Sequence, residues 1–129
     1  MATMDELVEF YGPPISVYTR AQAVEEGVLV DVSEWASPRQ MMGGFLVPVA
    51  MTRALFTALE KPSKRGEDLR GRAHDVLWMA LLAGRRHQEE LFQGDPIPYV
   101  VLSEGRKRQL QMILDGDGIV IGLAEEDLS

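Results

Sequence analysis

The stretch EDLRGRAHDVLWMALLAGRRH, residues 67–87, decides the fold of this protein. Its apolar residues recur at three- and four-residue spacing, the pattern of a helix with one buried face. They are Leu69, Ala73, Val76, Leu77, Ala80 and Leu81. Acidic residues at the start of the stretch and Arg85, Arg86 and His87 at its end complement the helix dipole. The pattern predicts one long helix, and we expect its middle to be the hydrophobic axis of the fold.

Shorter elements precede this helix. Thr19 begins a T-R-A-Q capping box, which predicts a helix from Arg20 that Gly27 closes after about two turns. Residues 28–32 form an apolar run of strand length. Ser33 or Ser37 is expected to cap a second short helix, residues 45–49 to be extended, and Thr52 to cap a helix that runs to about Glu60.

The pattern changes to strands after the QGDPIP turn. Residues 97–103, 107–114 and 119–123 are rich in β-formers and are separated by SEGR and DGDG, and an Asp-Gly pair between such runs is a strong hairpin signal. We therefore predict an α+β fold, in which the long helix and the shorter helices pack on a C-terminal antiparallel meander. Residues 1–129 are expected to form a single domain, with 1–14 as an N-terminal extension and 124–129 as an acidic tail that frays.

Composition sets the broad class. The chain has 129 residues, of which 46% are hydrophobic and 26% are charged, which is typical of one soluble globular domain. No run reaches the roughly 18 apolar residues of a membrane helix, and the N-terminus lacks the basic segment of a secretory signal. With no cysteine, the chain has no disulfide and no thiolate site. We expect a cytoplasmic protein of a bacterial host cell that has no membrane partner.

Charge is unevenly distributed along the chain. The net charge is −7; residues 1–34 carry seven acids and one base, residues 35–110 eight acids and twelve bases, and residues 111–129 five acids and no base. A DNA-binding protein normally concentrates cations on one face. The basic clusters, Lys61, Lys64 and Arg65 and then Arg106, Lys107 and Arg108, lie in turn-like segments beside acids. We interpret them as solvated loops and expect no direct DNA binding.

No motif for a metal or a cofactor stands out. His74 and His87 are thirteen residues apart, so they do not form the i, i+4 pair of a helical metal site. The DGDG segment, residues 115–118, lacks the later ligands of a calcium loop. No phosphate-binding loop, dinucleotide fingerprint or serine-hydrolase elbow is present. We expect no metal, no cofactor and, on balance, no enzyme.

One enzyme alternative stays open. A strand, helix and strand with Tyr18, Thr19 and Arg20 at the hinge resembles the opening of small ADP-ribosyltransferase folds, in which an early basic residue helps to hold the dinucleotide. That resemblance implies a small nucleotide-dependent transferase. The ligand-binding or catalytic set would be Tyr18, Thr19, Arg20, Asp31, Glu34 and Trp35.

A second resemblance covers about half of the chain. The blocks YTRAQAVEEGVLVDVSE, VPVAMTRALF, HDVLWMALLAGRR and DGDGIVIGLAEED occur in this order. They resemble an uncharacterised family of small bacterial proteins that phages, plasmids and other mobile elements carry. The resemblance implies a small accessory protein of mobile DNA and transfers no catalytic residue.

This context favours a non-enzymatic binding protein that inhibits a host defence complex, in the manner of anti-CRISPR or anti-restriction proteins. An anionic surface is attracted to the cationic groove of a nucleic-acid-binding protein by the same field that steers the groove's own ligand. The expected partner-binding residues are Asp5, Glu6, Glu9, Glu25, Glu26, Asp31, Glu125, Glu126 and Asp127. A homodimer is a further alternative, through Trp78, Met79 and Leu82 or through Trp35, Met41 and Met42, although core packing is the main interpretation of these residues.

Overall fold

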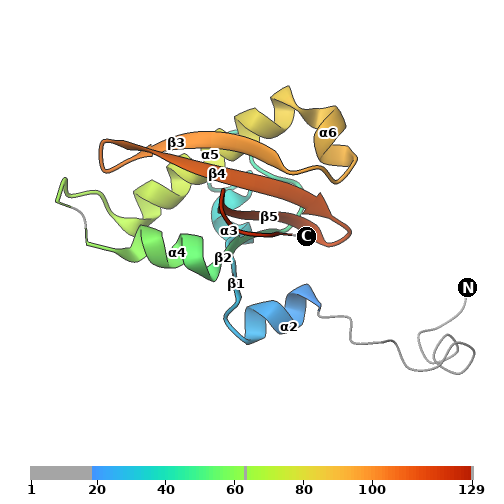
Figure 1. Cartoon of the computed structure of the whole chain (residues 1–129), viewed down its shortest axis with the longest axis horizontal. Helices are drawn as coiled ribbons and strands as arrows, with labels where there is room; N and C mark the ends of the chain where they lie inside the picture. Colours follow the sequence, from blue (N-terminus) through green and yellow to red (C-terminus); the bar gives the residue numbers. More distant parts are fainter. Residues whose placement is uncertain (1–18, 63, 129) are drawn as a thin grey trace, which may run out of the picture.

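The computed structural model describes residues 19–62 and 64–128 (Figure 1). In chain order the elements are α2 (Arg20–Glu25), β1 (Leu29–Asp31), α3 (Ser33–Ala36), β2 (Val49–Thr52), α4 (Arg53–Glu60), α5 (Leu69–Arg86), α6 (Gln88–Phe92), β3 (Ile97–Ser103), β4 (Arg106–Asp115) and β5 (Gly118–Leu123). They form the single α+β domain that the sequence predicts. No helix of the described ranges has the length and apolar character needed to cross a membrane.

The strands form one five-stranded sheet in the order β1-β2-β5-β4-β3. β3, β4 and β5 are the predicted antiparallel meander, with Tyr99 opposite Leu110 and Met112 opposite Ile121. β2 pairs with β5 in parallel, and β1 pairs with β2 in antiparallel fashion. The meander is therefore extended by two strands from the first half of the chain.

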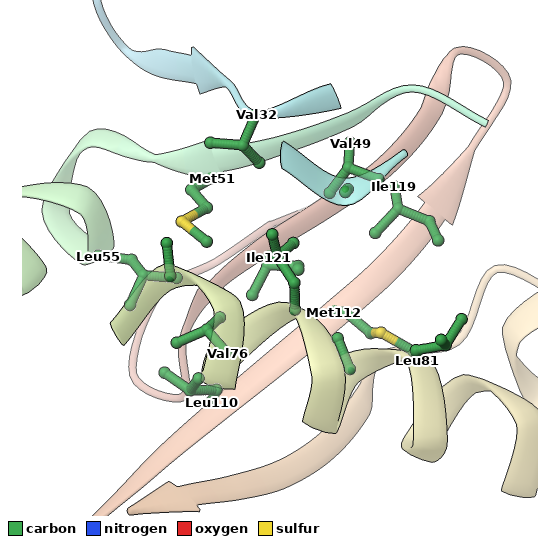
Figure 2. Close-up of a cluster of buried hydrophobic side chains, with 14 of the residues drawn as sticks. Val32, Val49, Met51, Leu55, Val76, Leu81, Leu110, Met112, Ile119 and Ile121 are labelled. Carbon is green, nitrogen blue, oxygen red and sulfur yellow. The ribbon is translucent and has the colours of Figure 1, made fainter. Parts of the chain in front are cut away.

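The long helix α5 packs on one face of this sheet, as expected. Asp68 caps it by accepting a hydrogen bond from the Gly71 amide at 2.6 Å. Its apolar stripe is buried against alternating residues of the strands, and β3 shows a strict alternation of buried and exposed positions. Figure 2 shows this core, where Val76 of α5 lies near Leu110 and Ile121 of the sheet and Leu81 of α5 lies near Met112. The middle of α5 is the hydrophobic axis of the fold.

Three local expectations differ from the structure. No helix begins at Ser37, because Ser37 is extended (ψ 158°) and ends α3, and its carbonyl then accepts from the amides of Gln40 and Met41 in a turn. The extended segment starts later than expected, at Val49. A short helix, α6, forms between α5 and the expected QGDPIP turn, over residues for which no element was predicted.

The acidic tail does not fray over the residues that the structure describes. The backbone amide of Ala124 donates to the carbonyl of Gln109 at 3.1 Å, and the side-chain amide of Gln111 donates through Nε2 to the carbonyl of Glu126 at 2.5 Å. The Glu126 carboxylate accepts from the Thr52 hydroxyl at 2.6 Å. The expectation of a loose tail is wrong because these polar contacts fasten the tail to β4 and to the end of β2.

Candidate functional site

A hollow of about 620 Å³ brings together three acidic segments that are distant in sequence. Glu26 follows α2, Asp115 and Asp117 lie at the turn between β4 and β5, and Glu126 and Asp127 come from the tail. We call these five residues the acidic face. The sequence predicted three of them, Glu26, Glu126 and Asp127, and the structure places all three around the same hollow.

Two arginines, Arg20 and Arg53, interrupt the acidic face. Arg20 donates to the carbonyl of Ile119 at 3.0 Å and lies 3.7 Å from Asp115. Arg53 donates to the carbonyl of Gly27 at 2.8 Å and lies 3.9 Å from Glu60. Each arginine thus connects α2 or the loop after it to the rest of the fold, and the lining keeps five acids against two bases.

The five acids have different structural roles. Asp115 accepts hydrogen bonds from the amides of Asp117 and Gly118 and shapes the turn. Glu126 is half-buried and accepts from Thr52 and from the Leu123 amide. The exposed members are Glu26, Asp115, Asp117 and Asp127. Their negative potential therefore faces solvent, while Glu126 serves mainly to hold the tail.

The other predicted acidic residues lie elsewhere. Glu25 and Asp31 line a smaller hollow of about 390 Å³ with Arg20, Ala21, Val24, Pro48 and Ala50. Asp31 also accepts from the amide and the hydroxyl of Ser33, which fixes the start of α3. Glu125 lines a different, basic hollow. Asp5, Glu6 and Glu9 lie outside the described residues.

A second and larger hollow, of about 1060 Å³, was missed by sequence reasoning. It lies between the α4–α5 loop and the start of β4, which share one end of the molecule in Figure 1. Seven cations and two acids line it. The cations are Lys61, Lys64, Arg65, Arg72, Arg106, Lys107 and Arg108, and the acids are Glu104 and Glu125. We call this hollow the basic cleft.

Arg72 of α5 holds the two sides of the basic cleft together. Its side chain is 4% exposed, donates to the carbonyls of Leu59 and Lys61 at 2.8 and 2.7 Å, and pairs with Glu104 at 2.6 Å. Glu104 stands in the β3–β4 turn with a positive φ of 57°. Arg72 therefore joins the end of α4 to the hairpin turn, and this joint brings two basic segments about forty residues apart to one place.

The residues of the transferase alternative do not share one hollow. Thr19 and Arg20 line the hollow of the acidic face, and Arg20 also lines the hollow of about 390 Å³ with Asp31. Glu34 and Trp35 line a small hollow of about 130 Å³ beside Phe56. Asp31 borders this small hollow and the one next to α2. Trp35 packs on Phe56 with ring centroids 6.3 Å apart, and the Arg70 guanidinium lies 4.8 Å from the Trp35 ring. Tyr18 lies outside the described residues.

The residues of the homodimer alternative fall in two places. Trp78 and Met79 border an apolar hollow of about 340 Å³ with Val100 and Leu102 of the edge strand β3, where Leu102 is 68% exposed. Leu82 is half-buried. Trp35 packs in the core and Met41 is buried, whereas Met42 is exposed. Trp35, Trp78 and Met41 therefore serve core packing.

One family model matches the chain, over residues 9–93. It describes a family of unknown function, DUF6573. No curated protein and no solved structure matches significantly. Because the match spans about two thirds of the sequence, the chain belongs to this family. The membership supports the expectation of an uncharacterised family and assigns no activity to any residue.

Proposed function

We propose that this member of the DUF6573 family is a non-enzymatic binding protein of a mobile element. Its acidic face docks on the basic surface of a host defence complex, of the CRISPR or restriction type, and keeps nucleic acid from that surface. The partner is a protein whose groove is built to hold phosphates, because such a groove attracts any correctly spaced set of exposed carboxylates.

The observation that carries this proposal is the convergence of acids from three segments. Glu26, Asp117 and Asp127 come from separate parts of the chain, yet all three border one hollow and are exposed. A small soluble domain gains solubility from scattered charges and has no need to gather them. A concave, anionic surface beside apolar Val28 and Leu128 offers both charge and contact area to a partner.

A phage plating assay tests this function. A DNA phage is plated on a set of bacterial strains, each of which carries a single defence system. Cells express the natural protein or the variant Glu25→Gln, Glu26→Gln, Asp117→Asn. We expect the natural protein to raise plating efficiency on at least one defended host. The variant should lose most of this effect, because it lacks two exposed charges of the acidic face, Glu26 and Asp117, and the charge of Glu25 next to Glu26 in sequence.

The matched control carries Asp75→Asn, Glu89→Gln and Glu90→Gln, three exposed acids on α5 and α6 that change net charge by the same amount. It is expected to keep the effect. The purified defence nuclease should then lose DNA affinity when the natural protein is added. Unchanged plating on every host, or equal protection by the natural protein and the acidic-face variant, contradicts the proposal.

A further inference from the structure

We propose that the basic cleft binds the phosphate backbone of nucleic acid, independently of the acidic face. The expectation of no direct DNA binding assumed that the two basic clusters lie in separate solvated loops. The structure joins them in one hollow with seven cations and two acids. The local charge of the cleft, and not the net charge of −7, decides what an extended polyanion meets there.

Most of these cations form no ion pair with another described residue. Within residues 19–62 and 64–128, no ion pair involves Lys61, Lys64, Arg106, Lys107 or Arg108. Arg72 forms ion pairs with Glu67 and Glu104 and donates to two carbonyls, so it acts as a strut. Five cations thus remain for a ligand with several negative groups.

The backbone of β4 presents these cations in an open arrangement. β5 pairs with β4 only as far as Leu110, so Arg106–Gln109 extends past the last paired residue of β5. Successive side chains of a strand point to opposite faces, which sends Arg106 and Arg108 to one face and Lys107 to the other. All three side chains nevertheless line the same cleft.

The acidic face is too far away to cancel this potential at ordinary salt. Arg106 and Asp115 are the two ends of the ten-residue strand β4, about 30 Å apart at 3.3 Å per residue. The Debye length is about 8 Å at physiological ionic strength. Figure 1 shows the β3–β4 turn and the β4–β5 turn at opposite ends of the molecule. Glu125 is the tail carboxylate within the cleft itself.

The lining also indicates how the ligand is recognised. Among the residues that the structure describes, no aromatic side chain lines the cleft, so bases have nothing there to stack on and single-strand binding through stacking is disfavoured. Contacts to phosphates carry no sequence information. The ligand is therefore a duplex, which has the higher density of negative charge, bound through its backbone without preference for base sequence.

Fluorescence anisotropy with a short labelled duplex, and with a single strand of equal length, tests this inference. If four phosphates are contacted, log K should fall against log salt with a slope of about −3.6 between about 50 and 200 mM. The duplex should bind more tightly than the single strand, and scrambling its sequence should not change the affinity.

The test variant carries Lys64→Gln, Arg106→Gln and Lys107→Gln, which remove three positive charges at exposed positions and leave a polar side chain at each. We expect at least about a tenfold loss of duplex affinity at 50 mM salt and a salt slope that is shallower by about 3. The control Arg39→Gln, Arg85→Gln, Arg86→Gln removes three exposed arginines outside the cleft and should keep the affinity within about threefold. Circular dichroism verifies that both variants fold.

Three results overturn the inference. The first is no binding by the natural protein at about 50 mM salt. The second is an equal loss of affinity in the cleft variant and the control. The third is displacement of the duplex by inorganic tripolyphosphate at the same phosphate concentration, because the cleft would then be a site for a small anion. Since the assay uses the isolated protein, its failure leaves the plating result of the acidic face unaffected.

Discussion

At the scale of single residues, Arg72 is the most constrained polar side chain of the described chain. It is one of three buried polar or charged residues there, and it contacts carbonyls at the end of α4 together with the carboxylates of Glu67 and Glu104. Removing one partner of a buried ion pair is costly because the remaining charges lose compensation. The same arginine fixes the shape of the basic cleft.

We predict that Arg72→Met lowers the free energy of unfolding by about 3 kcal/mol in urea denaturation. Arg86→Met, at an exposed position on the same helix, should cost less than about 0.5 kcal/mol. The Arg72 variant should also lose affinity for the duplex, because its two basic segments are no longer held together. A loss of stability below about 1 kcal/mol would show that Arg72 is not the joint we describe.

Tyr99 is the second constrained residue. Its hydroxyl donates to the carbonyl of Val76 in the middle of α5 at 3.2 Å, and burial raises the pKa of Tyr99 above its ordinary value. The folded state therefore holds the phenol proton more tightly than the unfolded state. The stabilisation is complete below pH about 10 and is lost as pH rises above that value.

Tyr99→Phe tests this linkage. At neutral pH the variant should be less stable by about 1 kcal/mol, because the Val76 carbonyl loses a donor. Above pH about 10 the natural protein should lose up to about 1.4 kcal/mol per pH unit more than the variant, so the two stabilities converge. Urea denaturation followed by circular dichroism at several alkaline pH values measures the difference. A difference that stays constant up to pH 11 would contradict the linkage.

At the scale of elements, Thr52 joins three parts of the fold. It is the last residue of β2, it caps α4 by accepting from the Leu55 amide at 3.2 Å, and it donates to Glu126 of the tail. Glu126 also accepts from the Leu123 amide at the end of β5. One carboxylate thus connects the tail to two neighbouring strands and to the start of a helix.

Glu126→Ala and Glu125→Ala form a matched pair of neighbouring substitutions. Glu126→Ala leaves the Thr52 hydroxyl and the Leu123 amide without their acceptor and should cost about 1–3 kcal/mol of stability. Glu125 is exposed, so its replacement should change stability by less than about 0.5 kcal/mol. Thermal denaturation compares the two proteins. Equal melting temperatures would mean that the tail is not fastened through this carboxylate.

Elements with local signals could be predicted from the sequence. The Thr19 capping box is formed, with the Gln22 amide donating to the Thr19 hydroxyl at 3.1 Å, and the predicted strands of the meander agree with the structure to within a few residues. The parallel pairing of Val49 with Ile119 could not be predicted, because it joins segments seventy residues apart. Docking of the tail was missed for the same reason, since its partners are distant in sequence.

The candidate site was likewise predictable only where the sequence carries a local signal. Acids near both ends of the chain were visible as a charge pattern, and the structure brings Glu26 and Asp127 to one hollow. In the sequence, the basic cleft appeared only as two short clusters of basic residues with acids beside them. What joins them is Arg72, which sequence reasoning treated as an ordinary residue of a helix. The signal that could have found the cleft is a basic residue within an otherwise buried helical stripe.

At the scale of the whole molecule, charge is separated between two regions. The acidic face has Asp115 at one end of β4, and the basic cleft has Arg106 at the other. A protein with a net charge of −7 can therefore attract partners of either sign, each at its own region. The proposed docking on a defence complex uses the first region, and the proposed contact with nucleic acid uses the second.

Retention on a phosphate-bearing cation exchanger, at neutral pH and about 10 mM salt, tests this separation of charge most directly. The natural protein should be retained despite its net charge of −7, and the Lys64, Arg106 and Lys107 triple variant should not be. On an anion exchanger, the Glu25, Glu26 and Asp117 variant should elute earlier than the Asp75, Glu89 and Glu90 control. Passage of the natural protein through the cation exchanger without delay would contradict the account.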